Sequence, residues 1–125
     1  MSVKNKKQFG VWLDNHHATI VGHGAESAGE FSVLGQVKNP GAAGNSNENA
    51  AQNHERALLR RYFDEITSHM PNADEIHATG TGTIQEQFIH HLAETPQFKN
   101  TVATESTTTK MSDEALVSHI TSQFS

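Results

Sequence analysis

The acidic side chain best placed to do chemistry in this 125-residue chain is Asp14, which directly follows an apolar run. An aspartate at the end of a buried strand can hold a divalent metal ion, and two-metal phosphodiester cleavage needs several such carboxylates at one point. Glu55 or Asp64 could join it, but the fourth predicted strand ends in Thr79 and Gly80, where a further acid would help. A metal-dependent nuclease is therefore one alternative function. A structural Asp14 that caps the following turn is favoured over it.

The nine histidines include two adjacent pairs, His16-His17 and His90-His91. Adjacent residues share neither a helix face nor a strand face, so neither pair naturally places two imidazoles on one ion. The chain has no cysteine and no His-x-x-x-His spacing that would complete a zinc site. We therefore expect no metal site and no cofactor.

The segment Thr79-Gly80-Thr81-Gly82-Thr83 ends a predicted strand and opens a predicted helix, where backbone amides could hold an anion. It lacks the third glycine of a dinucleotide-binding fingerprint and the Gly-Lys-Ser/Thr of a P-loop. The sequence favours a simple strand-to-helix turn, and Thr83 with Glu86 has the spacing of a capping box.

Charge is unevenly distributed along the chain, whose net charge is −5. Residues 1–63 hold seven Lys and Arg against five Asp and Glu, whereas residues 64–125 hold two against nine. An acidic total argues against bulk nucleic-acid binding and against DNA as a partner, but it leaves room for one local basic face. No apolar run is long enough to span a membrane, and no signal-type run follows the start. A cytoplasmic protein without disulfides is expected.

A long polar segment, residues 37–53, divides the chain. After Val37 it has no aromatic residue and no apolar side chain larger than alanine, so burial cannot offset its ordering entropy. We expect a mobile surface loop with basic stems, formed by Lys38 before it and by Arg56, Arg60 and Arg61 after it. For Arg60 and Arg61 themselves, the favoured interpretation is that they pair at helical spacing with acidic residues 64 and 65 on a solvated surface.

The remaining pattern predicts a βββ-loop-αβαβα order. Three strands over 9–14, 18–22 and 30–34 form a meander, a helix begins at His54 with an apolar stripe, and two further strands over 74–79 and 101–105 alternate with helices opened by Thr83 and Ser112. This order indicates a mixed five-stranded sheet covered on both faces, an α/β, ribonuclease-H-like three-layer domain. The residues expected on its buried faces and in its helix packing are Trp12, Ile20, Val33, Ile76, Val102, Phe63, Phe88 and Ile120. We expect a single domain over 9–125 with a flexible basic N-terminus, 1–8.

Several short motifs in this order resemble a known family. They are Phe9 to Asp14, Ala18-Thr19-Ile20, the glycine-bearing loop that runs into Arg56 to Tyr62, and Ala78 to Gly82 with Phe88. Together they resemble the middle domain of archaeal and eukaryotic class I peptide release factors and of Pelota, with small bacterial stand-alone relatives of that domain as the nearest match. The resemblance spans about Phe9 to Phe124.

In release factors of that family the equivalent loop carries Gly-Gly-Gln, which enters the peptidyl transferase centre and promotes hydrolysis of peptidyl-tRNA. This chain contains no Gly-Gly-Gln, and Gln36 and Gln52 lie at the loop ends without a glycine pair. The resemblance therefore implies a domain without the hydrolytic tripeptide, as in Pelota, and we expect no enzymatic activity.

The leading interpretation is a non-catalytic protein that associates with the translation machinery and contacts the ribosome or tRNA through the loop and its stems. A protein-interaction or homo-oligomeric module is the first alternative, and the nuclease is the second. The candidate contacts to RNA or the ribosome are Lys38, Gly41, Gly44, Asn45, Arg56, Arg60 and Arg61.

Overall fold

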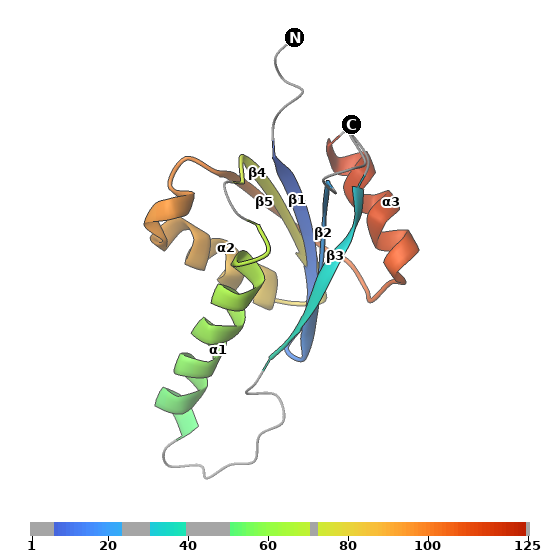
Figure 1. The fold of residues 1–125 in the computed structure, drawn as a ribbon. Coiled ribbons are helices and arrows are strands. Elements are labelled where there is room, and N and C mark those ends of the chain that lie inside the picture. Colours follow the sequence, from blue (N-terminus) through green and yellow to red (C-terminus); the bar gives the residue numbers. More distant parts are fainter. Residues whose placement is uncertain (1–6, 24–30, 40–50, 71–72, 125) are drawn as a thin grey trace.

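The computed structural model describes residues 7–23, 31–39, 51–70 and 73–124, with only the backbone described at residues 23 and 51–56. Its elements, in chain order (Figure 1), are β1 (Gln8–Leu13), β2 (His17–His23), β3 (Phe31–Lys38), α1 (Ala51–Thr67), β4 (Glu75–Gly80), α2 (Ile84–Glu94), the short 3₁₀ helix η2 (Pro96–Phe98), β5 (Val102–Thr107) and α3 (Asp113–Phe124). Among the described residues, no helix is long and apolar enough to cross a membrane.

The five strands form one mixed sheet in the order β3-β2-β1-β4-β5. β2 is antiparallel to both β1 and β3, which gives the predicted meander, whereas β4 runs parallel to β1 and β5 runs parallel to β4. The predicted βββ-loop-αβαβα order and the mixed five-stranded sheet are confirmed.

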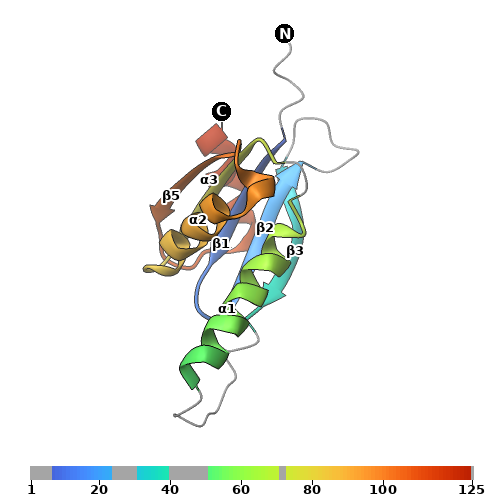
Figure 2. The ribbon, with the colours of Figure 1, turned by 90° about the vertical axis from the view of Figure 1, so that its left-hand side faces the viewer.

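Helices cover both faces of the sheet, with α1 and α2 on one side and α3 on the other (Figures 1 and 2). Alternate residues of β1 divide between the two cores, because successive side chains of a strand point to opposite faces. Val11 and Leu13 pack in the larger core beneath α1 and α2, whereas Trp12 packs beneath α3 with Leu116 and Ile120. The three-layer architecture is therefore confirmed.

The burial predicted for one residue is wrong. Val102 is 58% exposed, because β5 is an edge strand and α3 packs over β1, β2 and β3 instead. The other expected residues are buried, apart from Val33, which is half-buried against the core under α3.

The ends of the predicted loop lie in regular structure. β3 continues to Lys38 and α1 begins at Ala51, three residues before the predicted start at His54, so residues 37–38 and 51–53 belong to a strand and a helix. Residues 40–50 lie outside the described part of the chain. The helix η2 was not predicted, although Pro96 occupies a first-turn position suited to proline.

Of the two predicted helix N-caps, one is confirmed and one is wrong. The backbone amide of Ala115 donates to Ser112 Oγ at 3.2 Å, so the cap of α3 is confirmed. Thr83 has no side-chain cap hydrogen bond, and its φ of −95° and ψ of −6° place it in the helical region rather than the extended region of a capping residue. The predicted capping box at Thr83 and Glu86 is therefore wrong.

This difference gives a prediction for stability. Ser112→Ala is expected to lower the free energy of unfolding by about 1 kcal/mol, because it leaves the amide of Ala115 without its partner. Thr83→Ala is the matched control and should change it by less than about 0.5 kcal/mol. Urea unfolding of both variants measures the difference, and equal losses would contradict the assignment of the caps.

Candidate nucleic-acid interface

One end of the sheet gathers the carboxyl ends of four strands. β1, β4 and β5 run parallel to one another. β3 runs in the same direction as β1, because both strands are antiparallel to β2, which lies between them. At this end Asp14 follows β1, and Lys38, Gly80 and Thr107 are the last residues of β3, β4 and β5. The first turns of α1 extend past the same end of the sheet (Figure 1). In open α/β sheets, ligands bind at the carboxyl ends of the strands.

Asp14 caps the turn between β1 and β2. Its Oδ1 accepts the backbone amides of His16 at 2.8 Å and His17 at 2.9 Å. Burial of the carboxyl raises its pKa, but these amides and the neighbouring imidazoles lower it, and the pKa of Asp14 falls below its ordinary value. The structural role favoured from the sequence is confirmed.

The carboxylates considered for a nuclease do not gather around Asp14 in the described part of the chain. Asp64 instead contacts His91 on α2, with 3.0 Å between Oδ1 and Nε2. The side chain of Glu55 lies outside the described residues. No group of three or more His, Asp or Glu side chains among the described residues is arranged to hold a metal ion.

Tyr62 fixes α1 to the same end of the sheet. Its hydroxyl donates to the backbone carbonyl of Asp14 at 2.9 Å, and the side chain is fully buried. Burial, followed by the negative charge of Asp14, raises the pKa of Tyr62, so the phenol keeps its proton. The two residues that precede Tyr62, Arg60 and Arg61, are therefore held close to the level at which β1 ends.

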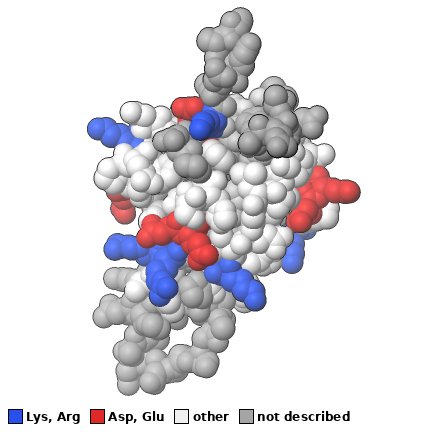
Figure 3. Space-filling view, in the orientation of Figure 1, with Lys and Arg blue, Asp and Glu red and all other residues white. Residues whose placement is uncertain are grey.

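Lys38, Arg60 and Arg61 are exposed and form no ion pair with any residue that the structure describes. The predicted pairing of the two arginines with Asp64 and Glu65 is wrong, because Asp64 reaches across to His91 rather than along its own helix. Figure 3, in the orientation of Figure 1, shows Lys and Arg side chains near the lower end of the described part of the molecule, with Asp and Glu side chains directly above some of them. The arginines are thus available to an anionic partner.

The other predicted contacts cannot be placed. Gly41, Gly44 and Asn45 lie outside the described residues, and Arg56 is described only as part of the α1 backbone. The structure therefore places three of the seven predicted contact residues, Lys38, Arg60 and Arg61, near the same end of the sheet.

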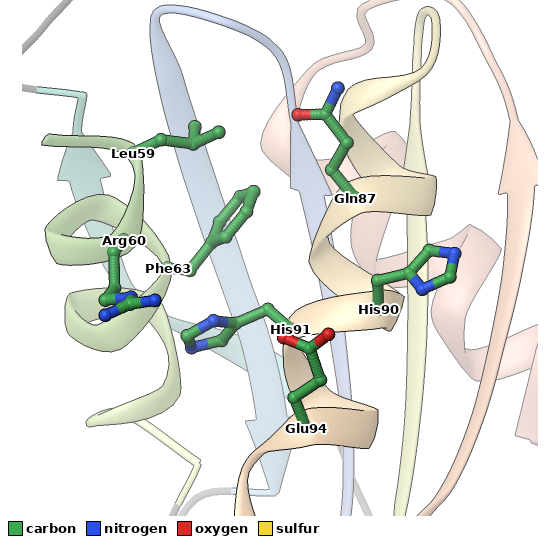
Figure 4. Close-up of a pocket in the computed structure, with 7 residues that line it drawn as sticks. All are labelled: Leu59, Arg60, Phe63, Gln87, His90, His91 and Glu94. Atoms are coloured by element: carbon green, nitrogen blue, oxygen red, sulfur yellow. The ribbon is translucent and has the colours of Figure 1, made fainter. Parts of the chain in front are cut away.

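A groove between α1 and α2 was not predicted. It has a volume of about 340 Å³ and is lined by Leu59, Arg60, Phe63, Gln87, His90, His91 and Glu94 (Figure 4). The positions on α2 recur at spacings of three, four and seven, which place them along one helix face. That spacing could have identified the α2 side of the groove from the sequence. The sequence does not show, however, that α1 packs beside this face of α2.

His77 on β4 is buried within the sheet, with 3% of its surface exposed. Its ring lies 2.8 Å from Thr104 Oγ1 through Nδ1 and 2.9 Å from Ser106 Oγ through Nε2. Burial, followed by the charge repulsion that a protonated His77 would meet from the neighbouring His119 ring, lowers the pKa of His77. Sequence reasoning treated it as one of several scattered histidines, although its place in a strand with neighbours on both sides predicts burial.

The lowered pKa predicts acid sensitivity. Because the fold favours the neutral ring, the unfolded chain binds the proton more readily, so the stabilisation is complete above the unfolded pKa of 6.5 and is lost as pH falls from there toward the folded pKa. His77→Gln should therefore lose less stability than the wild type between pH 7.5 and pH 5. Urea unfolding at each pH measures this, with His16→Gln as the exposed control. Equal pH slopes for the wild type and His77→Gln would contradict it.

No protein-family model and no curated protein sequence matches this chain. Its structure is similar to that of Thermoplasma acidophilum Pelota, with a TM-score of 0.60 and 18% identity over 91% of this chain and 31% of that one. It is also similar to an archaeal translation termination factor (TM-score 0.56, 10% identity, 87% and 32% covered) and to Archaeoglobus fulgidus Pelota (TM-score 0.56, 10% identity, 94% and 34% covered).

The chain spans about one third of the length of these structures. At these identities the likeness concerns the fold. The chain therefore has the fold of a domain-sized part of Pelota and of the archaeal termination factor, which confirms at the level of the fold the resemblance predicted from the sequence.

Proposed function

We propose that this protein is a non-catalytic, translation-associated factor that contacts RNA of the ribosome or tRNA with the basic end of its sheet. The observation that carries the proposal is the set of three exposed side chains, Lys38, Arg60 and Arg61, that have no acidic partner among the described residues. Exposed cations without ion pairs can neutralise phosphates without first breaking a salt bridge. In RNA binding, the release of counterions from those phosphates supplies much of the affinity.

The similar structures support the same reading. One of them is a translation termination factor, so this fold occurs in a protein of that process. The proposal extends to Arg56 and to the loop residues Gly41, Gly44 and Asn45, which follow or precede the described basic positions in the chain. It also takes residues 9–125 as one domain that acts in the cytoplasm.

Ribosome co-sedimentation tests this proposal. The wild-type protein should appear in the ribosomal fractions of a sucrose gradient at about 50 mM salt and should leave them at about 200 mM salt, since each phosphate contact adds to the salt dependence. Absence from the ribosomal fractions at both salt concentrations would contradict the proposed function. Self-association of the free protein in the same gradients would instead support the interaction-module alternative.

The protein is expected to release no peptide from peptidyl-tRNA on programmed ribosomes. Hydrolysis needs a group held accurately at the scissile ester, and a misplacement of about 1 Å can cost on the order of a hundredfold in rate. The segment 40–47 offers Ala42, Ala43 and Asn45 where the family's release factors have Gly-Gly-Gln. Release of labelled peptide above the ribosome-only background, measured beside an authentic release factor and lost in Asn45→Ala, would contradict the non-catalytic assignment.

A further inference from the structure

The groove between α1 and α2 has a rigid apolar floor. Phe63, 4% exposed, and the half-buried Leu59 extend from α1 toward α2 (Figure 4). The ring of Phe63 lies 5.4 Å from that of Phe88 and 5.4 Å from that of His91. Since His91 is itself held by Asp64 at 3.0 Å, the floor is fixed from both helices.

The rim of this groove carries polar side chains that have no partner within the described part of the chain. Arg60 lies on the α1 side, and Gln87 and Glu94 lie on the α2 side. None of these three side chains makes a hydrogen bond or an ion pair with a described residue. Gln87 and Glu94 are seven residues apart on α2, which separates their Cα atoms by about 10 Å along the helix. The groove therefore offers an amide at one end and a carboxylate at the other.

We propose that this groove binds one guanine base of single-stranded RNA, with Arg60 on an adjoining phosphate. The proposal rests on the proposed function, because Arg60 belongs to the same basic set. Bases of single-stranded RNA are commonly recognised through their Watson–Crick edges and through contacts with their flat faces. Here Leu59 and Phe63 would contact the flat face of the base.

The polar groups decide which base fits. Guanine presents two adjacent N–H donors on its Watson–Crick edge, and the ionised Glu94 carboxylate offers two acceptor oxygens and no donor. Guanine also presents one carbonyl acceptor, O6, at the other end of that edge, which suits the amide donors of Gln87. Adenine, cytosine and uracil each place a donor next to an acceptor on that edge, so none can satisfy both carboxylate oxygens.

An apolar protein segment fits the groove less well. It would cover Gln87 and Glu94 without offering them hydrogen bonds, and an unsatisfied buried polar group costs about 1–3 kcal/mol, or more when it is charged. A cation from a protein could pair with Glu94, but it would meet the positive charge of Arg60 on the opposite side of the groove.

Fluorescence anisotropy with labelled nine-nucleotide oligouridylates tests the proposal. The central position is G, A or inosine. Inosine keeps O6 and the N1 hydrogen of guanine but lacks the exocyclic amine. The wild type should bind the G oligonucleotide about tenfold more tightly than the A oligonucleotide, since a bidentate contact discriminates by that order. Inosine should fall between them.

Two variants separate the contacts. Glu94→Gln should abolish the preference for G over inosine, whereas Gln87→Ala should weaken the binding of G and inosine by the same factor. Glu86→Gln is the matched control, because it removes the same charge from an exposed position on α2 that does not line the groove. It should leave the preference for G intact.

Equal binding of all three oligonucleotides by the wild type would overturn the guanine site. If the protein still associated with ribosomes in a salt-dependent way, the proposed function would remain in place. Loss of the G preference in Glu86→Gln to the same extent as in Glu94→Gln would also overturn it. If no oligonucleotide binds but an apolar peptide displaces a probe from the groove, the occupant is a protein and the proposal is wrong.

Discussion

Replacing both Arg60 and Arg61 by glutamate is expected to lower ribosome association at least tenfold at about 50 mM salt. Each reversal removes a phosphate contact and adds a repulsive charge, and the loss of two contacts should also flatten the dependence of binding on salt concentration. The arginines make no ion pair with the described residues, so the fold does not depend on their charge. New like-charge neighbours at Asp64 and Glu65 should cost only about 0.2–0.5 kcal/mol each.

The matched control reverses two lysines at the opposite end of the sheet. Lys7 precedes β1 and Lys99 precedes β5, and both are exposed. Lys7→Glu with Lys99→Glu changes the net charge by the same amount as the arginine pair. A comparable loss of association in both double variants would mean that overall charge governs binding, and the assignment of the interface to Arg60 and Arg61 would then be wrong.

Gly80→Ala is expected to destabilise the fold by about 3 kcal/mol. A Cβ at Gly80 would lie 2.3 Å from the backbone oxygen of Leu13 on β1 and 2.9 Å from Oε1 of the fully buried Gln85. Leu13 pairs with Gly80 in the parallel ladder, so relief of this contact requires the ends of β1 and β4 to separate. The expected loss lies at the upper end of the range for overpacked cores.

Gly82→Ala provides the control two residues further along the same turn. A Cβ at Gly82 meets no atom within 4 Å, and its backbone is not in the left-handed region. Its stability should therefore stay the same or rise slightly, because alanine restricts the unfolded chain. Thermal unfolding should show a fall of roughly 10 °C for Gly80→Ala only. Similar melting temperatures for the two variants would contradict the close approach of the strands.

The fold was largely predictable from local patterns. Short runs of apolar residues marked the strands, the apolar stripe with Phe63 and Ile66 marked the first helix, and Ser112 marked the start of the last one. These signals are read correctly because they depend on the chemistry of neighbouring residues in the chain. Errors fell at element ends, such as the start of α1 at Ala51, and at Val102, whose exposure depends on which strand lies at the edge of the sheet.

The candidate interface depended more on tertiary structure. The sequence by itself determined that Lys38, Arg60 and Arg61 flank a polar segment, because order along the chain alone decides that. Only the packing of α1 against α2 decided that Asp64 contacts His91 and leaves Arg60 and Arg61 without an acidic partner among the described residues. The groove lined by Arg60 likewise forms only where α1 and α2 pack side by side on the sheet. A side chain's partner is chosen by distance in space, and residues 27 positions apart in sequence become neighbours only when the sheet brings their helices together.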